Sequence, residues 1–175
     1  MTGPTLDPLV QRALLSNNVA HEVLACDPDL ADTAAFCAHY GFSTEQAANT
    51  IIVASKKVAP PKYAACVLLG TTRLDVNKKV SELLAVKRLS FADEETTVDL
   101  TGMMIGGVTA FGIEDLPIYV DSAVMEQAQV VMGGGNRSSK LLLNPNELNK
   151  LPNVVVVEGL AKPQGVRGAN GQRSL

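Results

Sequence analysis

The chain has no tryptophan, two histidines and three cysteines, and these scarcities exclude several classes of chemistry. His21 and His39 are not arranged as metal ligands, and no His-Glu-x-x-His motif or paired-cysteine set occurs. Cys26, Cys37 and Cys66 are odd in number and lie in apolar segments without Cys-x-x-Cys spacing. We interpret them as buried thiols, and we expect no metal and no cofactor. The P-loop signature Gly-x-x-x-x-Gly-Lys-Ser/Thr is also absent, which argues against a P-loop enzyme.

Long apolar runs are missing as well, since no stretch reaches the roughly 18 consecutive apolar residues that a membrane span requires. The first seven residues lack the charged-then-apolar layout of a secretory signal. We therefore expect a cytoplasmic protein with no membrane partner. Its 175 residues, 46% of them hydrophobic, suffice for one domain with a substantial core. We assign 1–160 to this domain and 161–175 to a flexible C-terminal tail, because Gly, Gln, Arg, Asn and Ser dominate its sequence.

Positive charge is in slight deficit, because the formal net charge is −3 and the pI is near 5.4. This balance argues against a protein that binds phosphates over its whole surface, and we expect no DNA partner. Basic residues nevertheless cluster locally, and we interpret these clusters as solvated faces. Their members are Lys56, Lys57 and Lys62, then Lys78, Lys79, Lys87 and Arg88, and finally Arg137 and Lys140.

Hydrophobic periodicity and capping residues predict alternating helices and strands. Helices are expected over 7–16, 32–40 and 43–49, after Asp75, over 93–102 and from 144. Strands are expected over 21–26, 50–55, 63–70, 88–91, 117–121, 129–132, 140–143 and 154–157, with 50–55 and 63–70 as a central antiparallel pair. We predict a mixed α/β (α+β) fold, a single compact domain with a central mixed, largely antiparallel sheet surrounded by helices.

Two glycine-rich loops bracket the strand expected at 117–121. Glycine lets a backbone approach a ligand closely, so the loops can form one pocket wall of bare N–H groups. The first loop lacks the Gly-x-Gly-x-x-Gly spacing of a dinucleotide site and follows an expected helix, which disfavours that interpretation. The glycines are Gly106, Gly107 and Gly112 in the first loop and Gly133, Gly134 and Gly135 in the second.

Five segments, in this order and spacing, resemble the YbaK/ProX family over 9–151. They are Ala-Asn-Thr-Ile-Ile-Val-Ala (48–54), Leu-Asp-Val-Asn-Lys-Lys-Val (74–80), Thr-Gly-Met-Met-Ile-Gly-Gly-Val-Thr-Ala-Phe-Gly (101–112), Leu-Pro-Ile-Tyr-Val-Asp (116–121) and Gly-Gly-Asn-Arg (134–137). That family, also found as the editing insertion of bacterial prolyl-tRNA synthetases, hydrolyses wrongly charged aminoacyl-tRNA, typically alanine or cysteine on proline tRNA. The resemblance implies a mixed-sheet α/β fold whose glycine loops line the aminoacyl pocket.

Three positions depart from the family pattern. Members with deacylase activity generally carry a lysine at the position of Asn49 in this chain. The family's Gly-x-x-x-Pro loop ends here in Ala110, and the serine that often precedes the second loop is replaced by Gly133. Lys56 or Lys57 could supply the missing cation from the following loop, although a solvated surface position is the simpler interpretation.

The resemblance also implies roles for individual residues. As catalytic residues it implies Asn49, Gly106, Gly107 and Thr109, with backbone N–H groups stabilising the oxyanion and Asn49 orienting the ester. As substrate-binding residues it implies Val108, Ala110, Gly133, Gly134, Arg137 and Asp121, the last by accepting backbone N–H bonds from the glycine loop. Purely structural alternatives are a tight turn at Gly106 and Gly107, a helix C-cap at Asn49, and an ion pair between Arg137 and Glu126.

Three functional hypotheses follow. The first is an aminoacyl-tRNA deacylase acting in trans, to which an aminoacyl-tRNA synthetase or elongation factor delivers the substrate. The second is a binding module that keeps the pocket and the affinity for aminoacyl-tRNA or amino acid but has lost turnover. The third is nucleotide or other small-molecule binding by the same loops.

Overall fold

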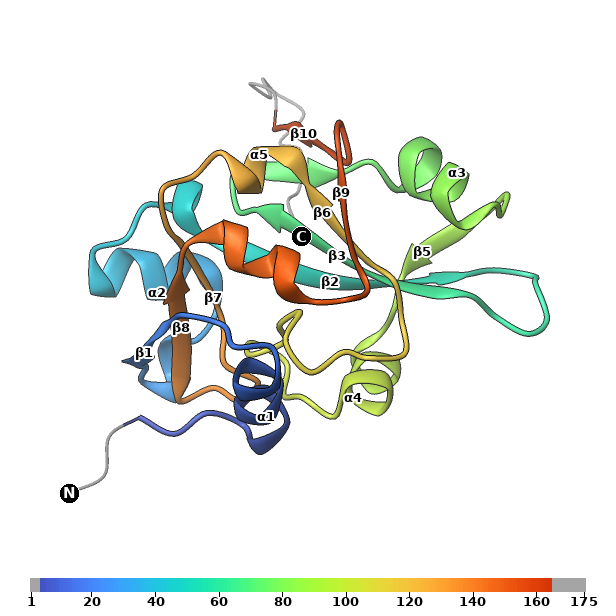
Figure 1. The fold of residues 1–175 in the computed structure, drawn as a ribbon. Coiled ribbons are helices and arrows are strands. Elements are labelled where there is room, and N and C mark those ends of the chain that lie inside the picture. The colour runs from blue at the N-terminus through green and yellow to red at the C-terminus, as the bar shows by residue number, and fades with distance from the viewer. Residues whose placement is uncertain (1–3, 165–175) are drawn as a thin grey trace.

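The structure, a computed structural model, describes residues 4–164 and is organised around a five-stranded sheet (Figure 1). In spatial order its strands are β5 (Leu89–Phe91), β2 (Ala48–Ser55), β3 (Tyr63–Leu69), β6 (Ile118–Asp121) and β9 (Val154–Val157). The pairings of β5 with β2 and of β2 with β3 are antiparallel, whereas those of β3 with β6 and of β6 with β9 are parallel. The predicted mixed fold is confirmed, with the β2–β3 pair at the centre of the sheet.

Two smaller antiparallel sheets complete the strands. One contains β1 (Glu22–Ala25), β8 (Ser139–Leu143) and β7 (Val130–Gly133), in that order. An isolated parallel bridge between Ala47 and Val131 joins its β7 edge to the start of β2. The other sheet pairs β4 (Thr72–Leu74) with β10 (Ala161–Pro163).

The helices begin and end largely where the capping residues predict. They are α1 (Pro8–Ser16), α2 (Thr33–Tyr40), α3 (Ser81–Leu84), α4 (Glu94–Thr101) and α5 (Ser122–Met125), with short turns η1 (Pro28–Leu30), η2 (Thr44–Gln46), η3 (Val76–Val80) and η4 (Pro145–Lys150). The Asp7 carboxylate accepts a 2.8 Å hydrogen bond from the Leu9 N–H and so caps α1. Gly41 and Gly102 adopt left-handed conformations that end α2 and α4.

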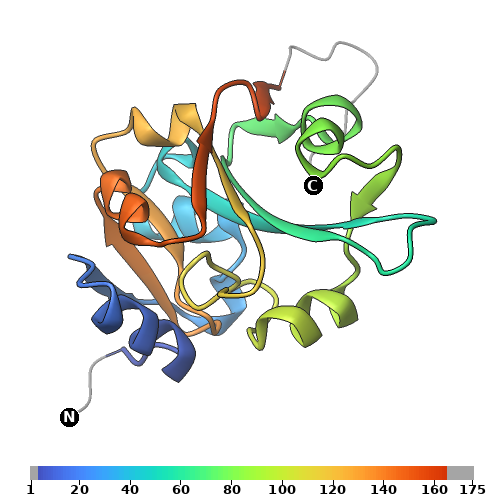
Figure 2. The ribbon, with the colours of Figure 1, turned by 45° about the vertical axis from the view of Figure 1, so that its right-hand side comes forward.

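Side chains of β3 are buried on both faces of the central sheet, which explains its uninterrupted apolar sequence. Ala65 and Val67 pack into the core that α1, β7 and β8 cover, whereas Cys66 and Leu68 pack into the core beneath η3 and α3. All three cysteines are buried and unpaired, as predicted. Figure 2 shows the β2–β3 hairpin extending well beyond these cores, between α3 and α4.

Several elements differ from the sequence prediction. The strands β4 and β10 and the helix α5 were not predicted, and the helix expected over 43–49 ends at Gln46, so that Asn49 lies in β2 rather than at a helix C-cap. Residues 161–163 form β10, which corrects the predicted boundary at 160, whereas 165–175 of the expected tail lie outside the described residues. Within 4–164, no helix has the length and apolar character to cross a bilayer.

Candidate active-site cleft

A cleft of about 440 Å³ opens along the outer edge of β2, within the range of roughly 300–1,000 Å³ usual for small-molecule sites. On this edge β5 pairs with β2 from Val53 to Ser55, and β7 bridges to it at Ala47. Within the described part of the chain, 48–51 have no strand partner on this side. The interruption of pairing leaves room for the cleft, whose walls come from α2, β5, β8 and the two glycine loops.

The two glycine loops pack backbone against backbone behind the cleft. The Gly107 carbonyl accepts a 2.7 Å hydrogen bond from the Gly135 N–H, and a Cβ atom on Gly107 would collide with the backbone of Asn136. A Cβ atom on Gly133 would in turn collide with the Gly107 carbonyl. Gly106 and Gly133 line the cleft. The loops therefore meet in one wall, which admits no side chain at Gly107 or Gly133.

Several backbone N–H groups of the first loop are not used inside the fold, and three of them belong to residues that line the cleft. The Gly107 N–H donates to the Met104 carbonyl at 2.9 Å, and the Thr109 N–H donates to the Met103 sulfur at 3.4 Å. Within the described residues, the N–H groups of Ile105, Gly106 and Val108 have no hydrogen-bond partner, and all three residues line the cleft. The loop donors available to a ligand oxygen therefore come from these three groups, of which Gly106 and Val108 flank Gly107.

Polar side chains of β2 add to the cleft. The Asn49 Oδ1 accepts a 2.7 Å hydrogen bond from the Thr33 hydroxyl of α2, which leaves the Asn49 NH2 group as a donor. Thr50 also lines the cleft, and its buried hydroxyl has no partner in the described residues. Buried polar groups are usually hydrogen-bonded, so an unpaired hydroxyl beside a cleft is a group that a ligand can satisfy.

Lys140 brings a buried ammonium to the same cleft. Its Nζ donates to the Ala31 carbonyl at 2.6 Å and to the Gly106 carbonyl at 2.9 Å, and it lies 5.6 Å from the centroid of the Phe36 ring. Only 7% of the residue is exposed, so the interpretation of Lys140 as part of a solvated face is wrong. Removal from water lowers the pKa of Lys140 below its ordinary value, and the nearby charge of Arg137 acts in the same direction.

Arg137 fixes the first glycine loop from the outside. Its guanidinium donates to the carbonyls of Pro28 and Ile105, at 2.9 and 3.0 Å, and forms a 3.3 Å ion pair with Asp32. The alternative pairing with Glu126 is not observed. Gly106 has a φ of +92°, and a Cβ atom there would collide with the Arg137 guanidinium. The conformation thus favours glycine at 106, and a larger residue would also displace the end of the Arg137 side chain.

The other residues implied by the resemblance lie behind or away from the cleft. Thr109 and Ala110 are fully buried, and Gly134 accepts a 3.0 Å hydrogen bond from the Asp7 N–H at the start of α1. Asp121 accepts a 3.2 Å hydrogen bond from the Ala161 N–H, not from the glycine loop. Of the ten residues, the structure brings Asn49, Gly106, Val108 and Gly133 to the cleft.

Sequence reasoning missed Lys140 and Thr50 as site residues. Lys140 stands in a buried strand, four residues beyond Asn136 of the second loop, and the apolar residues that follow it, Leu141 to Leu143, are the signal that could have indicated its burial. Lys56 and Lys57, by contrast, are exposed in the β2–β3 loop, as expected, and do not line the cleft.

The model of the aminoacyl-tRNA editing domain family matches residues 27–151, which include the cleft's β2 edge, both glycine loops and Lys140. The chain belongs to this family. The resemblance to YbaK/ProX proteins, the YbaK-like members of the editing family, is therefore confirmed.

Solved structures share the fold. The hypothetical protein APE2540 is 24% identical with a TM-score of 0.77, over 88% of this chain and 99% of that chain. A protein proposed to be a trans-editing enzyme for prolyl tRNA synthetase is also 24% identical, with a TM-score of 0.75, over 91% of this chain and 100% of that chain. At these identities the likeness concerns the arrangement of the chain in space, and the chemistry rests on the residues of the cleft.

Proposed function

We propose that this editing-domain protein is an aminoacyl-tRNA deacylase that acts in trans and hydrolyses the ester of mischarged tRNA. The observation that carries the proposal is the gathering, on one cleft, of donors that the fold leaves wholly or partly unused. The N–H groups of Gly106 and Val108, the Asn49 amide and the Lys140 ammonium all belong to residues that line it. Ester hydrolysis requires such donors, because negative charge develops on the carbonyl oxygen.

The reaction follows from this donor set. A water molecule attacks the ester carbonyl carbon, and the former carbonyl oxygen becomes an oxyanion that the Gly106 and Val108 N–H groups stabilise. The bond between that carbon and the ribose oxygen then breaks, the ribose oxygen takes up the proton lost by water, and the free amino acid and the tRNA leave. Asn49 donates to the ester or to the terminal ribose, while Gly107 and Thr109 hold the loop in shape.

Lys140 offers a physical explanation for the absence of a lysine at 49. Two of its three N–H bonds are used by the Ala31 and Gly106 carbonyls, and the third has no partner among the described residues. We infer that this ammonium supplies, from β8, the positive potential that the family pattern places on β2. A single donor to an oxyanion is typically worth about 10²–10³ in rate.

The apolar walls of the cleft favour a small aminoacyl group. Phe36, Val108 and Met132 line it, and the half-exposed β2 edge leaves room for part of the terminal nucleoside. Alanine or cysteine on proline tRNA, the substrates that the family resemblance implies, is the substrate class that we propose. Ala110, which replaces the family proline, is buried behind the loop and affects its rigidity rather than the wall itself.

The competing possibility is a binding module without turnover, favoured by Asn49 and its hydrogen bond to Thr33. An Asn49→Lys variant separates the two. If Lys140 already supplies the cation, Asn49→Lys leaves the rate of hydrolysis unchanged or lowers it, because a second ammonium enters the same cleft. A large gain in Asn49→Lys would instead identify the natural protein as a degenerate editor.

The test of the proposed function is a deacylation assay with proline tRNA charged with alanine, cysteine, serine or proline. We expect hydrolysis of a mischarged species and protection of the prolyl ester. Absence of hydrolysis on all four would contradict the proposal. A pull-down with and without tRNA tests the further proposal that a synthetase or elongation factor delivers the substrate.

A further inference from the structure

The positive charge of this chain is strongly segregated. Residues 56–88 hold eight basic and two acidic side chains, a formal charge of +6, while the remainder of the chain carries −9. The overall value of −3 therefore conceals a basic region. Charge concentrated in this way creates a local potential that a polyanion can recognise even on an acidic protein.

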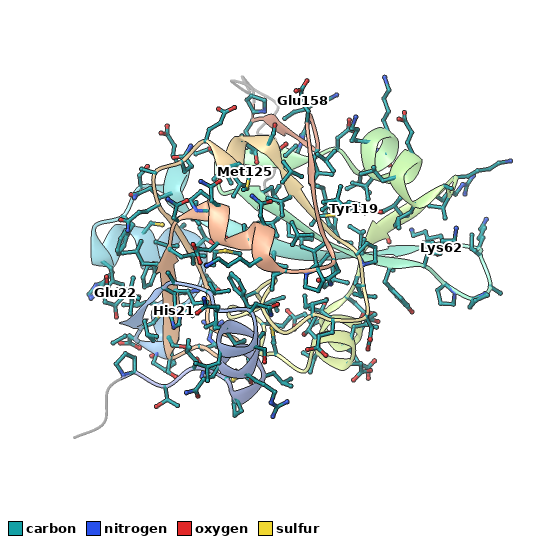
Figure 3. The ribbon with its side chains drawn as sticks, viewed as in Figure 1. His21, Glu22, Lys62, Tyr119, Met125 and Glu158 are labelled. Atoms are coloured by element: carbon teal, nitrogen blue, oxygen red, sulfur yellow. The ribbon has the colours of Figure 1, made fainter. Side chains whose placement is uncertain are left out.

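Five members of this region surround one junction of the fold and are all exposed. They form what we term the basic surface: Lys56, Lys57, Lys62, Lys87 and Arg88. The Lys56 N–H donates to the Arg88 carbonyl at 2.9 Å, which holds the hairpin loop beside the start of β5. The Lys62 Nζ donates to the Leu84 carbonyl at the end of α3, at 3.1 Å. Figure 3 shows Lys62 on the part of the hairpin that projects from the sheet.

The charges of the basic surface are not neutralised inside the fold. Within 4–164, none of its five side chains forms an ion pair. The acidic residues closest in sequence to Lys87 and Arg88 are Glu82 on α3 and Asp93 before α4, and Asp93 is already committed to capping that helix. Unpaired, solvated cations on a protruding hairpin are well placed to replace the counterions of a phosphate backbone.

The basic surface continues directly into the cleft. Arg88 immediately precedes β5, and Phe91 at the end of β5 lines the cleft while 37% of its surface remains exposed. An aromatic ring that is exposed between the basic surface and a pocket offers a face on which an unpaired nucleotide base can stack.

We propose that the basic surface binds the phosphate backbone of the tRNA acceptor end, and that Phe91 stacks on a base of the unpaired 3′ strand as it enters the cleft. This inference rests on the proposed function, since it places the nucleic-acid part of the same substrate. In this arrangement the hairpin and β5 supply the affinity for tRNA, and the cleft carries out the hydrolysis.

The experiment measures binding of uncharged proline tRNA to the full chain as a function of salt. The test variant is Lys56→Gln/Lys57→Gln/Arg88→Gln, whose three side chains make no hydrogen bond within the described residues. The control, Arg12→Gln/Lys150→Gln/Lys162→Gln, removes the same formal charge elsewhere on the surface. Because it also breaks the ion pairs of Lys150 with Glu147 and of Lys162 with Asp75, thermal unfolding first establishes that both variants are folded. We expect weaker binding by the test variant, with the slope of log affinity against log salt reduced by about 2–3, and a near-normal slope in the control.

Phe91→Ala is measured in parallel on intact tRNA and on tRNA lacking the terminal CCA. We expect roughly a tenfold loss of affinity for intact tRNA only, because stacking requires the unpaired 3′ end. If the test and control variants lose the same affinity for tRNA, the loss is explained by net charge alone and the proposal is overturned. Unchanged binding by the test variant would overturn it as well. Hydrolysis of the alanyl ester of adenosine reports on the cleft alone. If wild type fails on this ester and on charged tRNA while the binding pattern holds, the proposed function fails and the basic surface stands.

Discussion

The Nζ atom of Lys140 lies 2.9 Å from the carbonyl oxygen of Gly106, which joins a buried cation on β8 to the loop that carries the free N–H groups. The contact ties the position of the first glycine loop to the protonation of one side chain. It also brings together two features that lie 34 residues apart in the chain.

This link predicts an alkaline limit to activity. Burial lowers the pKa of Lys140 from its ordinary value of 10.5, and only the charged form stabilises an oxyanion. The rate of deacylation should therefore decline as pH rises through a pKa below that of a free lysine. A Lys140→Arg variant should hold its activity to higher pH, because arginine stays protonated there. Identical pH–rate profiles for the two proteins would contradict the role of the ammonium.

Gly106→Ala should abolish most of the activity. The substitution strains a φ of +92° and drives a methyl group into the Arg137 guanidinium, so either that side chain, which holds the Ile105 carbonyl, or the loop itself must move. Gly159→Ala is the matched control, because Gly159 has a φ of +74° but faces open space. Both should lose about 1–2 kcal/mol of unfolding free energy to backbone strain. Only Gly106→Ala should lose about 10²-fold in rate, and equal rates in the two variants would argue against a catalytic loop.

Thr50→Val should separate stability from function. The Thr50 hydroxyl is buried and unpaired within the described residues, so its removal should leave the unfolding free energy unchanged or slightly higher. If a substrate atom pairs with that hydroxyl, the variant should lose about 1 kcal/mol of substrate binding, roughly fivefold in KM. Thermal unfolding and steady-state kinetics on the same preparation test both parts, and a clear drop in stability would show that the hydroxyl has a structural partner.

Asp121 is predicted to act on stability rather than on catalysis. Burial raises its pKa above the ordinary 3.8, although backbone N–H groups of Ala161, Leu160 and Ala123 oppose the shift. In the pH range from 3.8 up to the raised value, the folded state binds more protons than the unfolded state, so this group lowers stability as pH rises. Asp121→Asn should lose that slope. Asp121→Ala should cost about 1–3 kcal/mol by leaving the Ala161 N–H unpaired, with little change in the rate of deacylation.

Much of this fold follows from local sequence. Asp7, Gly41 and Gly102 mark helix ends by capping chemistry that needs no tertiary partner, and the apolar run of β3 indicates a strand buried on both faces. β4 and β10 escaped prediction because each has three residues and is stabilised by pairing with the other across about half the chain.

The site was less predictable, for a physical reason. The glycines of both loops can be read from the sequence. Which of their N–H groups remain free for a ligand depends on which ones the fold itself uses, and the N–H groups of Gly107 and Thr109 are used in this way. The burial of Lys140 depends on Ala31 and Gly106, which are distant in sequence, so a lone lysine after a loop resembles a surface residue until the fold is known.

Single-turnover deacylation of alanyl-tRNA(Pro) by wild type, Lys140→Gln and Lys140→Arg at neutral pH tests most directly whether the buried ammonium serves the reaction. Glutamine keeps a donor but removes the charge, and arginine keeps the charge. We expect Lys140→Gln to be slower than wild type by about 10²-fold at equal tRNA affinity, and Lys140→Arg to retain most of the rate. A Lys140→Gln variant as fast as wild type would show that the buried ammonium does not serve the reaction.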